Sequence, residues 1–431
     1  MRDEQQTKWV TGSPLSGKVV KGKFFSPILG VEKHYNVYLP PGYEQSRRRY
    51  PVLYLFRGHE DEWFNPYQDH SRGGEAVQHL GDDLIRRRRI GKMLIVGVSS
   101  TSDDGEVQGL GVNFLNPRAV QKHPGVGSGR FEDYLVYDLI PHIDATYRTI
   151  ADREHRGADG FSLGGFTAVM LAVKHPELFG SVGCYDGSHM FHNLNDPRLN
   201  FTTFDDPLWV RNDDMFAPAF RRPRHKKYDI DYLLSYNTLN LLEQLPPQEK
   251  AKVQSIHFYI TSAAFDGFQG NRDRAIHLMT VFALHGIENR ATSLILCNDA
   301  HHNWKFADLH LRLSLPLHSQ KFRITPPDRV FGTGPVSRGH LKILAVHNSQ
   351  PLKRDIEVSY RVEKQMPVKI EILNTRGEQI AVVKNEVHPP GEYRVSWSGN
   401  ARDGRQIASD IYFIQFCTPL GAVWEKLVFL R

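Results

Sequence analysis

The most informative part of the sequence reads Arg156-Gly157-Ala158-Asp159-Gly160-Phe161-Ser162-Leu163-Gly164-Gly165, followed by the apolar run 166–174. The first residues are predicted to form a short strand. Residues 166–174 are predicted to form an amphipathic helix that ends at His175-Pro176, because proline cannot continue a helix. The Gly-x-Ser-x-Gly motif between them is typical of a nucleophile elbow, in which glycines permit the close backbone approach of a tight strand-to-helix turn.

Such a turn would lift the Ser162 hydroxyl above the sheet and direct the first amides of the helix towards an anion formed there. A bare Gly-x-Ser-x-Gly is common enough by chance to be a weak signal. The strand–turn–helix context, and the acidic residue and histidine that follow in order, make it a strong one.

The bulk composition indicates a globular protein of more than one domain. The chain has 431 residues, of which 40% are hydrophobic and 24% are charged, and no apolar run approaches the length that spans a bilayer. The net charge of +6 includes two short basic runs, 86–89 and 221–227, without the aromatic-interleaved stripe of a nucleic-acid site, so no nucleic-acid partner is expected. Three well-separated cysteines, Cys184, Cys297 and Cys417, suggest neither a disulfide framework nor a metal site.

Strands and helices alternate over the first three quarters of the chain. A hairpin is predicted over residues 18–43, and the later strands and helices are listed here in turn: strands 50–56 and 93–98, helices 74–88 and 131–147, strands 179–185, 255–261 and 291–297, and helix 272–285. This alternation predicts an α/β fold with a doubly wound, mostly parallel sheet and an antiparallel hairpin at its edge, whose ligands bind at the carboxyl ends of the strands.

Changes in composition along the chain predict two domains joined by a linker. Residues 1–322 are predicted to form the α/β domain, interrupted at 186–254 by a cap-like insert with a helix near 231–245. A Pro/Gly-rich linker is predicted over 323–340. Short alternating strands from 341 to 431 predict an all-β sandwich of about immunoglobulin size.

Hydrolysis of an ester by serine needs a base for the hydroxyl proton, a carboxylate to orient that base and amides to hold the oxyanion. In this topology the acid follows the serine and precedes the histidine. Asp266, the first carboxylate after strand 255–261, is the predicted acid, with Asp273 and Asp299 as weaker alternatives. The base is expected at His301 or His302, after strand 291–297.

The remaining site assignments are less constrained by the sequence. The predicted oxyanion donors are the backbone amides of Leu163 and His59. Trp63, Trp209 and Trp304 are predicted to bind substrate, although the aromatic side chains of the insert could equally form its own small core. No metal or other cofactor is expected, since no further ligand stands at helical spacing from the two histidines.

These stretches resemble the Putative esterase family, which includes feruloyl and acetylxylan esterases, enterochelin-type esterases, formylglutathione hydrolases and mycolyltransferases. The likeness spans residues 18–322 and rests on residues 38–43, 50–55 and 131–148, on the serine motif and on His302-Asn303-Trp304, similar to the family's His-x-Trp ending. It implies an α/β-hydrolase fold with Ser162 as nucleophile, His302 as base and Asp266 as acid. One departure is Arg57-Gly58, where the family usually has His-Gly.

The tail, residues 345–431, resembles the immunoglobulin-like C-terminal sorting domain of type IX secreted proteins. It matches at 356–360, 390–399 and 407–413 but lacks the usual Asn-Pro-Phe start. This likeness implies export, with secretion machinery or the cell surface as a partner, whereas residues 1–6 lack the apolar core of a signal peptide. We expect a secreted or cell-surface protein whose signal segment has been removed; the alternative is a cytoplasmic protein.

The leading functional hypothesis is a serine carboxylesterase that acts, through an acyl-enzyme, on feruloyl- or acetyl-type esters of carbohydrates or similar bulky alcohols. One alternative is an acyltransferase that uses the same three residues and excludes water better. Another is a binding protein on a hydrolase fold that has lost its chemistry. Neither the acyl group nor the alcohol can be inferred from the sequence.

Overall fold

The computed structural model describes residues 15–191, 209, 213–265, 270–291, 293–297, 299–324, 341–348, 356–374, 379–401, 404–407, 410–418 and 421–429. The chain divides into two compact units. The first comprises Met1–Tyr259 with His302–Val330, and the second comprises Ile260–His301 with Phe331–Arg431.

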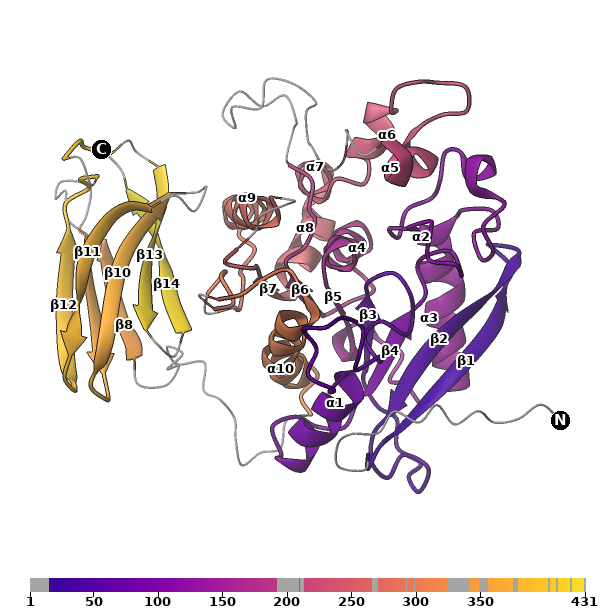
Figure 1. Ribbon diagram of the computed structural model, residues 1–431, viewed down its shortest axis with the longest axis horizontal. Coiled ribbons are helices and arrows are strands. Elements are labelled where there is room, and N and C mark those ends of the chain that lie inside the picture. The colour runs from indigo at the N-terminus through magenta and orange to yellow at the C-terminus, as the bar shows by residue number, and fades with distance from the viewer. Residues whose placement is uncertain are drawn as a thin grey trace. The chain divides into compact units, whose positions relative to one another are not determined.

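A seven-stranded sheet has the order β1-β2-β4-β3-β5-β6-β7 (Figure 1). Its strands are β1 (Lys18–Ser26), β2 (Val31–Leu39), β3 (Val52–Phe56), β4 (Leu94–Val98), β5 (Arg156–Gly160), β6 (Ser181–Tyr185) and β7 (His257–Thr261). β1 and β2 form an antiparallel hairpin, β2 is antiparallel to β4, and β3 pairs in parallel with β4 and β5. The predicted α/β architecture with an antiparallel edge hairpin is confirmed.

The central strands are buried on both faces. Every residue of β3 and β4 is buried, which explains why these strands read as continuous apolar runs rather than as an alternation of apolar and polar residues. β5 is equally buried but consists of Arg-Gly-Ala-Asp-Gly, so its small residues leave room for helices to approach closely.

Helices cover both faces of these strands. They are α1 (Val77–Arg86), α4 (Leu163–Lys174) and α10 (Trp304–Lys321). α4 packs on β3, β5 and β6, while α10 packs on β6 and lies beside α1 (Figure 1). Adjacent residues of β6 show that α4 and α10 take opposite faces. Gly183 faces Asp159, which is hydrogen-bonded to α10, and Cys184 faces Gly165 of α4.

The helix predicted over 131–147 is present but not uniform. It runs through α2 (Phe131–Asp133), the π-helical segment η2 (Tyr134–Leu139) and α3 (Ile140–Thr146). Short 3₁₀ turns, η1 (Pro117–Val120) and η3 (Arg153–His155), lie elsewhere in the unit. A π-helical turn changes the register of the buried face, which a 3.6-residue period does not predict.

In the insert, the single helix predicted near 231–245 is two helices, α6 (Ile230–Leu234) and α7 (Thr238–Gln244). Each has its own N-cap, because Asp229 accepts from the Tyr232 amide and Asn237 from the Leu239 amide. α5 (Asp213–Phe220) and α8 (Pro247–Gln254) complete the described helices of the insert, and α7 packs on α4.

In the second unit the helix predicted at 272–285 is confirmed as α9 (Asn271–Leu284). The strand predicted at 291–297 is not formed in its described residues. Instead, Ile295 makes an isolated parallel bridge with Ser262, supported by bonds from the Ser262 amide to Leu294 O and from the Leu296 amide to Ser262 O. Two backbone hydrogen bonds are too few to pair a strand with the sheet, so the largely apolar residues 293–297 contact Ser262 at this one bridge without forming a strand.

The C-terminal part of the chain is all β. One sheet has the order β11-β10-β13-β14 and the other β12-β9-β8. The strands are β8 (Leu341–Asn348), β9 (Ile356–Val362), β10 (Met366–Asn374), β11 (Gln379–His388), β12 (Gly391–Trp397), β13 (Asp410–Thr418) and β14 (Gly421–Phe429). Buried side chains from both sheets, among them Val358, Ile370 and Phe416, form one core.

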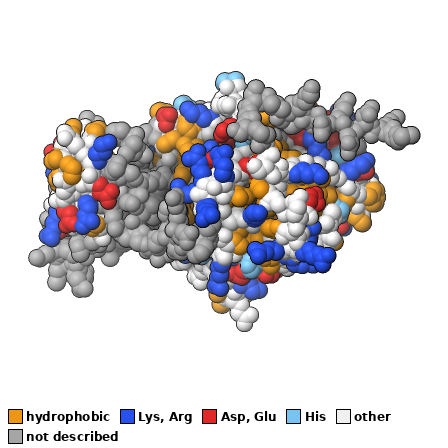
Figure 2. All heavy atoms as spheres, turned by 90° about the horizontal axis from the view of Figure 1, so that it is seen from below, with side chains coloured by type: hydrophobic (Ala, Val, Ile, Leu, Met, Phe, Trp, Pro, Cys, Tyr) orange, Lys and Arg blue, Asp and Glu red, His pale blue; other side chains and the backbone are white. Residues whose placement is uncertain are grey.

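The surface carries mixed charge. On the face drawn in Figure 2, lysine and arginine side chains are interspersed with acidic and apolar ones. None of the helices in the described part of the chain combines the length and apolar character that crossing a bilayer requires.

Candidate active site

Ser162 stands at the sharp turn between β5 and α4. It is the N-cap of α4, with φ 59° and ψ −124°, a left-handed conformation that non-glycine residues rarely adopt. The glycines on either side explain how the chain tolerates this turn. A Cβ added at Gly160 would lie 2.2 Å from the Gly164 carbonyl oxygen, and one at Gly164 would lie 2.1 Å from that of Phe56. The predicted elbow is therefore present.

Strand β6 brings Asp186 beside Ser162. Phe161 and Tyr185 form a parallel bridge, and the Ser162 amide donates to Tyr185 O at 3.1 Å. The Ser188 amide in turn donates to Ser162 O at 3.1 Å, so the chain after β6 is tied to the elbow on both sides of Asp186. Asp186 is fully buried and also has a positive φ, of 47°, which aspartate tolerates better than most residues.

His302 meets this carboxylate directly. Its Nδ1 lies 2.5 Å from Asp186 Oδ2, and its ring centroid lies 4.6 Å from that of Phe161, the residue before Ser162. Two residues later α10 begins, capped by the Asn303 side chain, which accepts from the Phe306 amide. The second histidine, His301, instead stacks on Phe265 with ring centroids 4.9 Å apart.

Asp186 was missed by the sequence analysis, which assigned the acid to Asp266. Asp266 lies outside the described residues, and the carboxylate that the structure brings to His302 is Asp186. The signal was present: Asp186-Gly187 directly follows the strand adjacent to β5, and its position still satisfies the order serine, acid, histidine.

The two predicted oxyanion donors differ in their surroundings. Leu163 is the first residue of α4, so its amide belongs to the positive end of that helix. The His59 amide donates to Glu62 Oε1 at 2.8 Å, while the Glu62 amide donates back to His59 O at 3.2 Å. The Glu62 carboxylate thus already holds the second predicted donor.

The three tryptophans predicted to bind substrate pack among other protein groups. Trp63 donates its indole N–H to Phe56 O, and Trp209 donates to Ser188 O and stacks on Phe216. Trp304 lies edge-on to Trp63, with ring centroids 5.0 Å apart. All three side chains are buried, which argues against direct contact with a substrate, and their role there stays a prediction.

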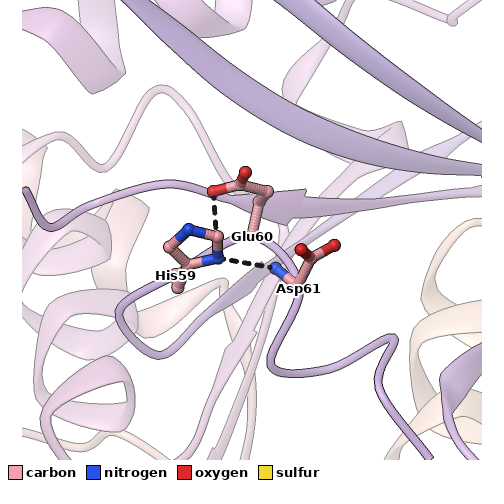
Figure 3. A group of neighbouring side chains, drawn as sticks. All are labelled: His59, Glu60 and Asp61. Carbon is pink, nitrogen blue, oxygen red and sulfur yellow. Dashed lines mark hydrogen bonds and ion pairs between the residues drawn. The ribbon is translucent and has the colours of Figure 1, made fainter. Parts of the chain in front are cut away.

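An acidic cluster lies in the loop after β3. Ligand atoms of His59, Glu60 and Asp61 all fall within 4.8 Å of one another (Figure 3). Asp61 Oδ1 already accepts from Lys21 Nζ at 2.9 Å and from Asn36 Nδ2 at 2.7 Å. Burial opposes ionisation of Asp61, but these two donors outweigh it and lower its pKa. Lys21 thus supplies one positive charge to the cluster, beside the carboxylate of Asp61.

A buried network fixes the strand that leads to Ser162. Asp159 accepts from Ser314 Oγ at 2.6 Å and lies 3.1 and 3.2 Å from Nε2 of His310 and His318, all on α10. Burial disfavours the charged carboxylate, but the two histidines more than compensate and hold the pKa of Asp159 well below its usual range. The helix that follows His302 is thereby anchored to the strand that precedes Ser162.

Comparison with known proteins identifies relatives that are named as esterases. The chain is 30% identical over 190 residues to an endo-1,4-beta-xylanase/feruloyl esterase of Xylanibacter ruminicola, covering 42% of this chain and 23% of that protein. It is 31% identical over 201 residues to Esterase Rv1288 of Mycobacterium tuberculosis, covering 43% of this chain and 39% of that protein. The chain thus spans well under half the length of these relatives.

The structure is also similar to that of a ferulic acid esterase, with a TM-score of 0.52 at 20% identity, over 72% of this chain and 100% of the other. At this identity the likeness establishes the α/β-hydrolase fold. Residues 26–285, more than half of the sequence, match the family described as Putative esterase. The chain therefore belongs to the Putative esterase family.

Proposed function

We propose that this protein is a serine carboxylic ester hydrolase with Ser162 as nucleophile, His302 as base and Asp186 as the carboxylate that orients it. The observation that carries the proposal is the 2.5 Å contact between His302 Nδ1 and Asp186 Oδ2, beside a serine held at positive φ. A histidine whose Nδ1 is bound by a carboxylate is fixed in the tautomer that presents Nε2 to a hydroxyl.

In the first step, Ser162 Oγ attacks the ester carbonyl carbon while its proton passes to His302 Nε2. The buried Asp186, in contact with His302 Nδ1, stabilises the resulting imidazolium. The proton then passes to the alcohol as the carbon–oxygen bond of the ester breaks, leaving an acyl-enzyme. Water, deprotonated by the same histidine, then attacks the acyl carbon. The bond from that carbon to Ser162 Oγ breaks, the proton returns from His302 to Oγ, and the acid is released.

The oxyanion would be held by the Leu163 amide at the N-terminus of α4. The His59 amide is the second proposed donor. Because this amide donates to Glu62 Oε1 in the structure, Glu62 must release it when the oxyanion forms. The exchange replaces one negatively charged acceptor by another.

Esters of carbohydrates with feruloyl or acetyl groups are the proposed substrates. The name of the Xylanibacter relative, which joins a xylanase to a feruloyl esterase, supports this class. A transferase reaction would use the same acyl-enzyme, with a second alcohol in place of water.

The test is hydrolysis of para-nitrophenyl acetate, butyrate and octanoate and of methyl ferulate by wild type and Ser162→Ala. We expect the variant to lose about 10⁴-fold or more in kcat, because the nucleophile is gone while binding remains. Product in excess over hydrolysis when glycerol or a sugar is added would indicate the transferase. Equal rates in both proteins would overturn the proposal.

A further inference from the structure

Arg57 lies at the carboxyl end of β3, where ligands of such sheets bind. Its guanidinium carbon is 5.4 Å from the centre of the Phe161 ring, the same ring on which His302 packs at 4.6 Å. The Phe161 ring, next to Ser162, therefore contacts both the proposed base, His302, and the permanent positive charge of Arg57.

The charge of Arg57 is only loosely balanced. Within the described part of the chain its ion-pair partner is Glu62, with Nε and Oε2 3.7 Å apart, too long for a hydrogen bond. The Nε atom is buried with no hydrogen-bond partner there, although the whole side chain is 24% exposed. The other Glu62 oxygen is committed to the His59 amide, which keeps this carboxylate from closing on the guanidinium.

A guanidinium has a planar fork of N–H donors that matches one carboxylate. In Arg57 this group is partly buried, still accessible to solvent, and only weakly paired with Glu62. Its single positive charge would be balanced by one carboxylate, which is planar and carries one negative charge. The buried Arg72 shows the satisfied alternative, because it holds Asp308 through Nε and Nη2 at 2.8 and 2.6 Å. Arg57 has the chemistry for such a pair, but its partner Glu62 lies beyond hydrogen-bond distance of Nε.

We propose that Arg57 binds a carboxylate on the substrate, and that the enzyme prefers esters with a negative charge close to the scissile bond. This inference rests on the proposed esterase function. The bound carboxylate would take the place of Glu62 beside the guanidinium, with its two oxygens accepting from the fork. Arg57 is then a specificity-determining residue.

Two matched pairs of probes test the preference and locate the charge. The acyl-side pair is para-nitrophenyl hydrogen glutarate and its methyl ester; the alcohol-side pair is para-acetoxybenzoate and its methyl ester. For each pair, the ratio of kcat/KM for the anionic over the neutral probe is measured. We expect Arg57→Gln to lower this ratio about ten-fold or more in one pair, because a hydrogen-bonded charge pair is lost.

Two further variants separate charge from shape. Arg57→Lys keeps the charge but loses the fork, so its ratio should fall between those of wild type and Arg57→Gln. Glu62→Gln keeps an oxygen to accept from His59 but removes the competing charge, so it should raise the ratio, mainly by lowering KM for the anionic probe.

An unchanged ratio in Arg57→Gln for both pairs, or a wild type that favours the neutral probe in both, would overturn the proposal. Failure of the esterase function itself looks different: neither member of either pair would then be hydrolysed in a Ser162-dependent way.

Discussion

At the scale of single residues, the proposed site depends on two residues whose backbone has a positive φ, Ser162 and Asp186. Each sits just beyond the carboxyl end of a parallel strand, and the backbone bonds between Ser162, Tyr185 and Ser188 set the spacing of both. Strain of this kind persists only where the surroundings over-determine it. We therefore expect the glycines around Ser162 to be as necessary to the proposed site as the serine.

Gly164→Ala tests this requirement. The new Cβ would lie 2.1 Å from the Phe56 carbonyl oxygen, so the turn at Ser162 must shift. We expect the free energy of unfolding to fall by about 2 kcal/mol or more, and esterase activity to be lost as well. Gly73→Ala is the matched control, since nothing lies within 4 Å of its added Cβ. Urea denaturation that gave equal midpoints for the two variants would contradict the account.

The sequence predicted Ser162 and His302 but not the carboxylate that meets His302. Spacing along the chain favoured Asp266, because it follows a later strand, whereas Asp186 depends on β6 lying next to β5, a property of the sheet order. The burial of Trp63, Trp209 and Trp304 was also not predictable, since an aromatic residue near a site can pack inwards or face a ligand. Side-chain direction depends on tertiary packing.

At the scale of elements, Glu132 joins the helix 131–146 to α4 and to the insert. It lies 2.9 Å from Lys174 Nζ and 2.8 Å from His175 Nε2, and it accepts from the Tyr236 hydroxyl at 2.7 Å. Burial opposes its ionisation, but these three partners outweigh burial and lower its pKa from 4.5 to about 2.

A pKa lowered on folding stabilises the folded state above the unfolded pKa and ceases to do so as the pH falls through the folded one. The contribution of Glu132 should therefore be complete above about pH 4.5 and lost towards pH 2. We expect Glu132→Gln to cost about 3 kcal/mol at pH 7, with the difference from wild type shrinking below pH 4.5.

Urea denaturation at several pH values measures this difference. Glu177→Gln is the control. Glu177 contacts the same His175, but it is exposed and its carboxylate lies 3.6 Å from Nδ1, so the substitution should change the free energy of unfolding by about 0.5 kcal/mol or less. A Glu132→Gln cost that is constant from pH 7 to 3 would show that the carboxylate acts through packing alone.

The predicted elements held best where the signal was local. β3, β4 and α9 lie within a few residues of their predicted bounds, and for the two strands the local signal is a continuous apolar run. The break between α6 and α7 depends on capping by Asn237, and the π-helical η2 depends on packing against its neighbours. The described residues of 291–297 form no strand because they make a single isolated bridge, between Ile295 and Ser262.

At the scale of the whole molecule, the C-terminal sheets have a hydrophobic core of their own, formed by residues between Leu341 and Phe416. Their all-β character was predicted from the alternation of short strands. The likeness to a sorting domain, and with it a secreted or cell-surface location, stays a prediction.

A separate core predicts separate unfolding. Ile370 is fully buried in it, so Ile370→Ala should cost about 2–5 kcal/mol within that core. Calorimetry of the full chain should then show one transition shifted to lower temperature, while the temperature at which esterase activity is lost stays unchanged. Val387→Ala, at an exposed position of β11, should shift neither. A parallel fall of both transitions in Ile370→Ala would mean that the cores unfold as one.

The central claim is that Asp186, paired with His302, is the acid of a serine esterase. It is tested most directly by kcat/KM for para-nitrophenyl acetate in Asp186→Asn and Asp266→Asn, each compared with wild type. We predict a loss of about 10⁴-fold in Asp186→Asn, because the amide no longer holds His302 in the required tautomer, and a loss at least about 100-fold smaller in Asp266→Asn. The reverse order of the two losses would contradict the account and place the acid at Asp266.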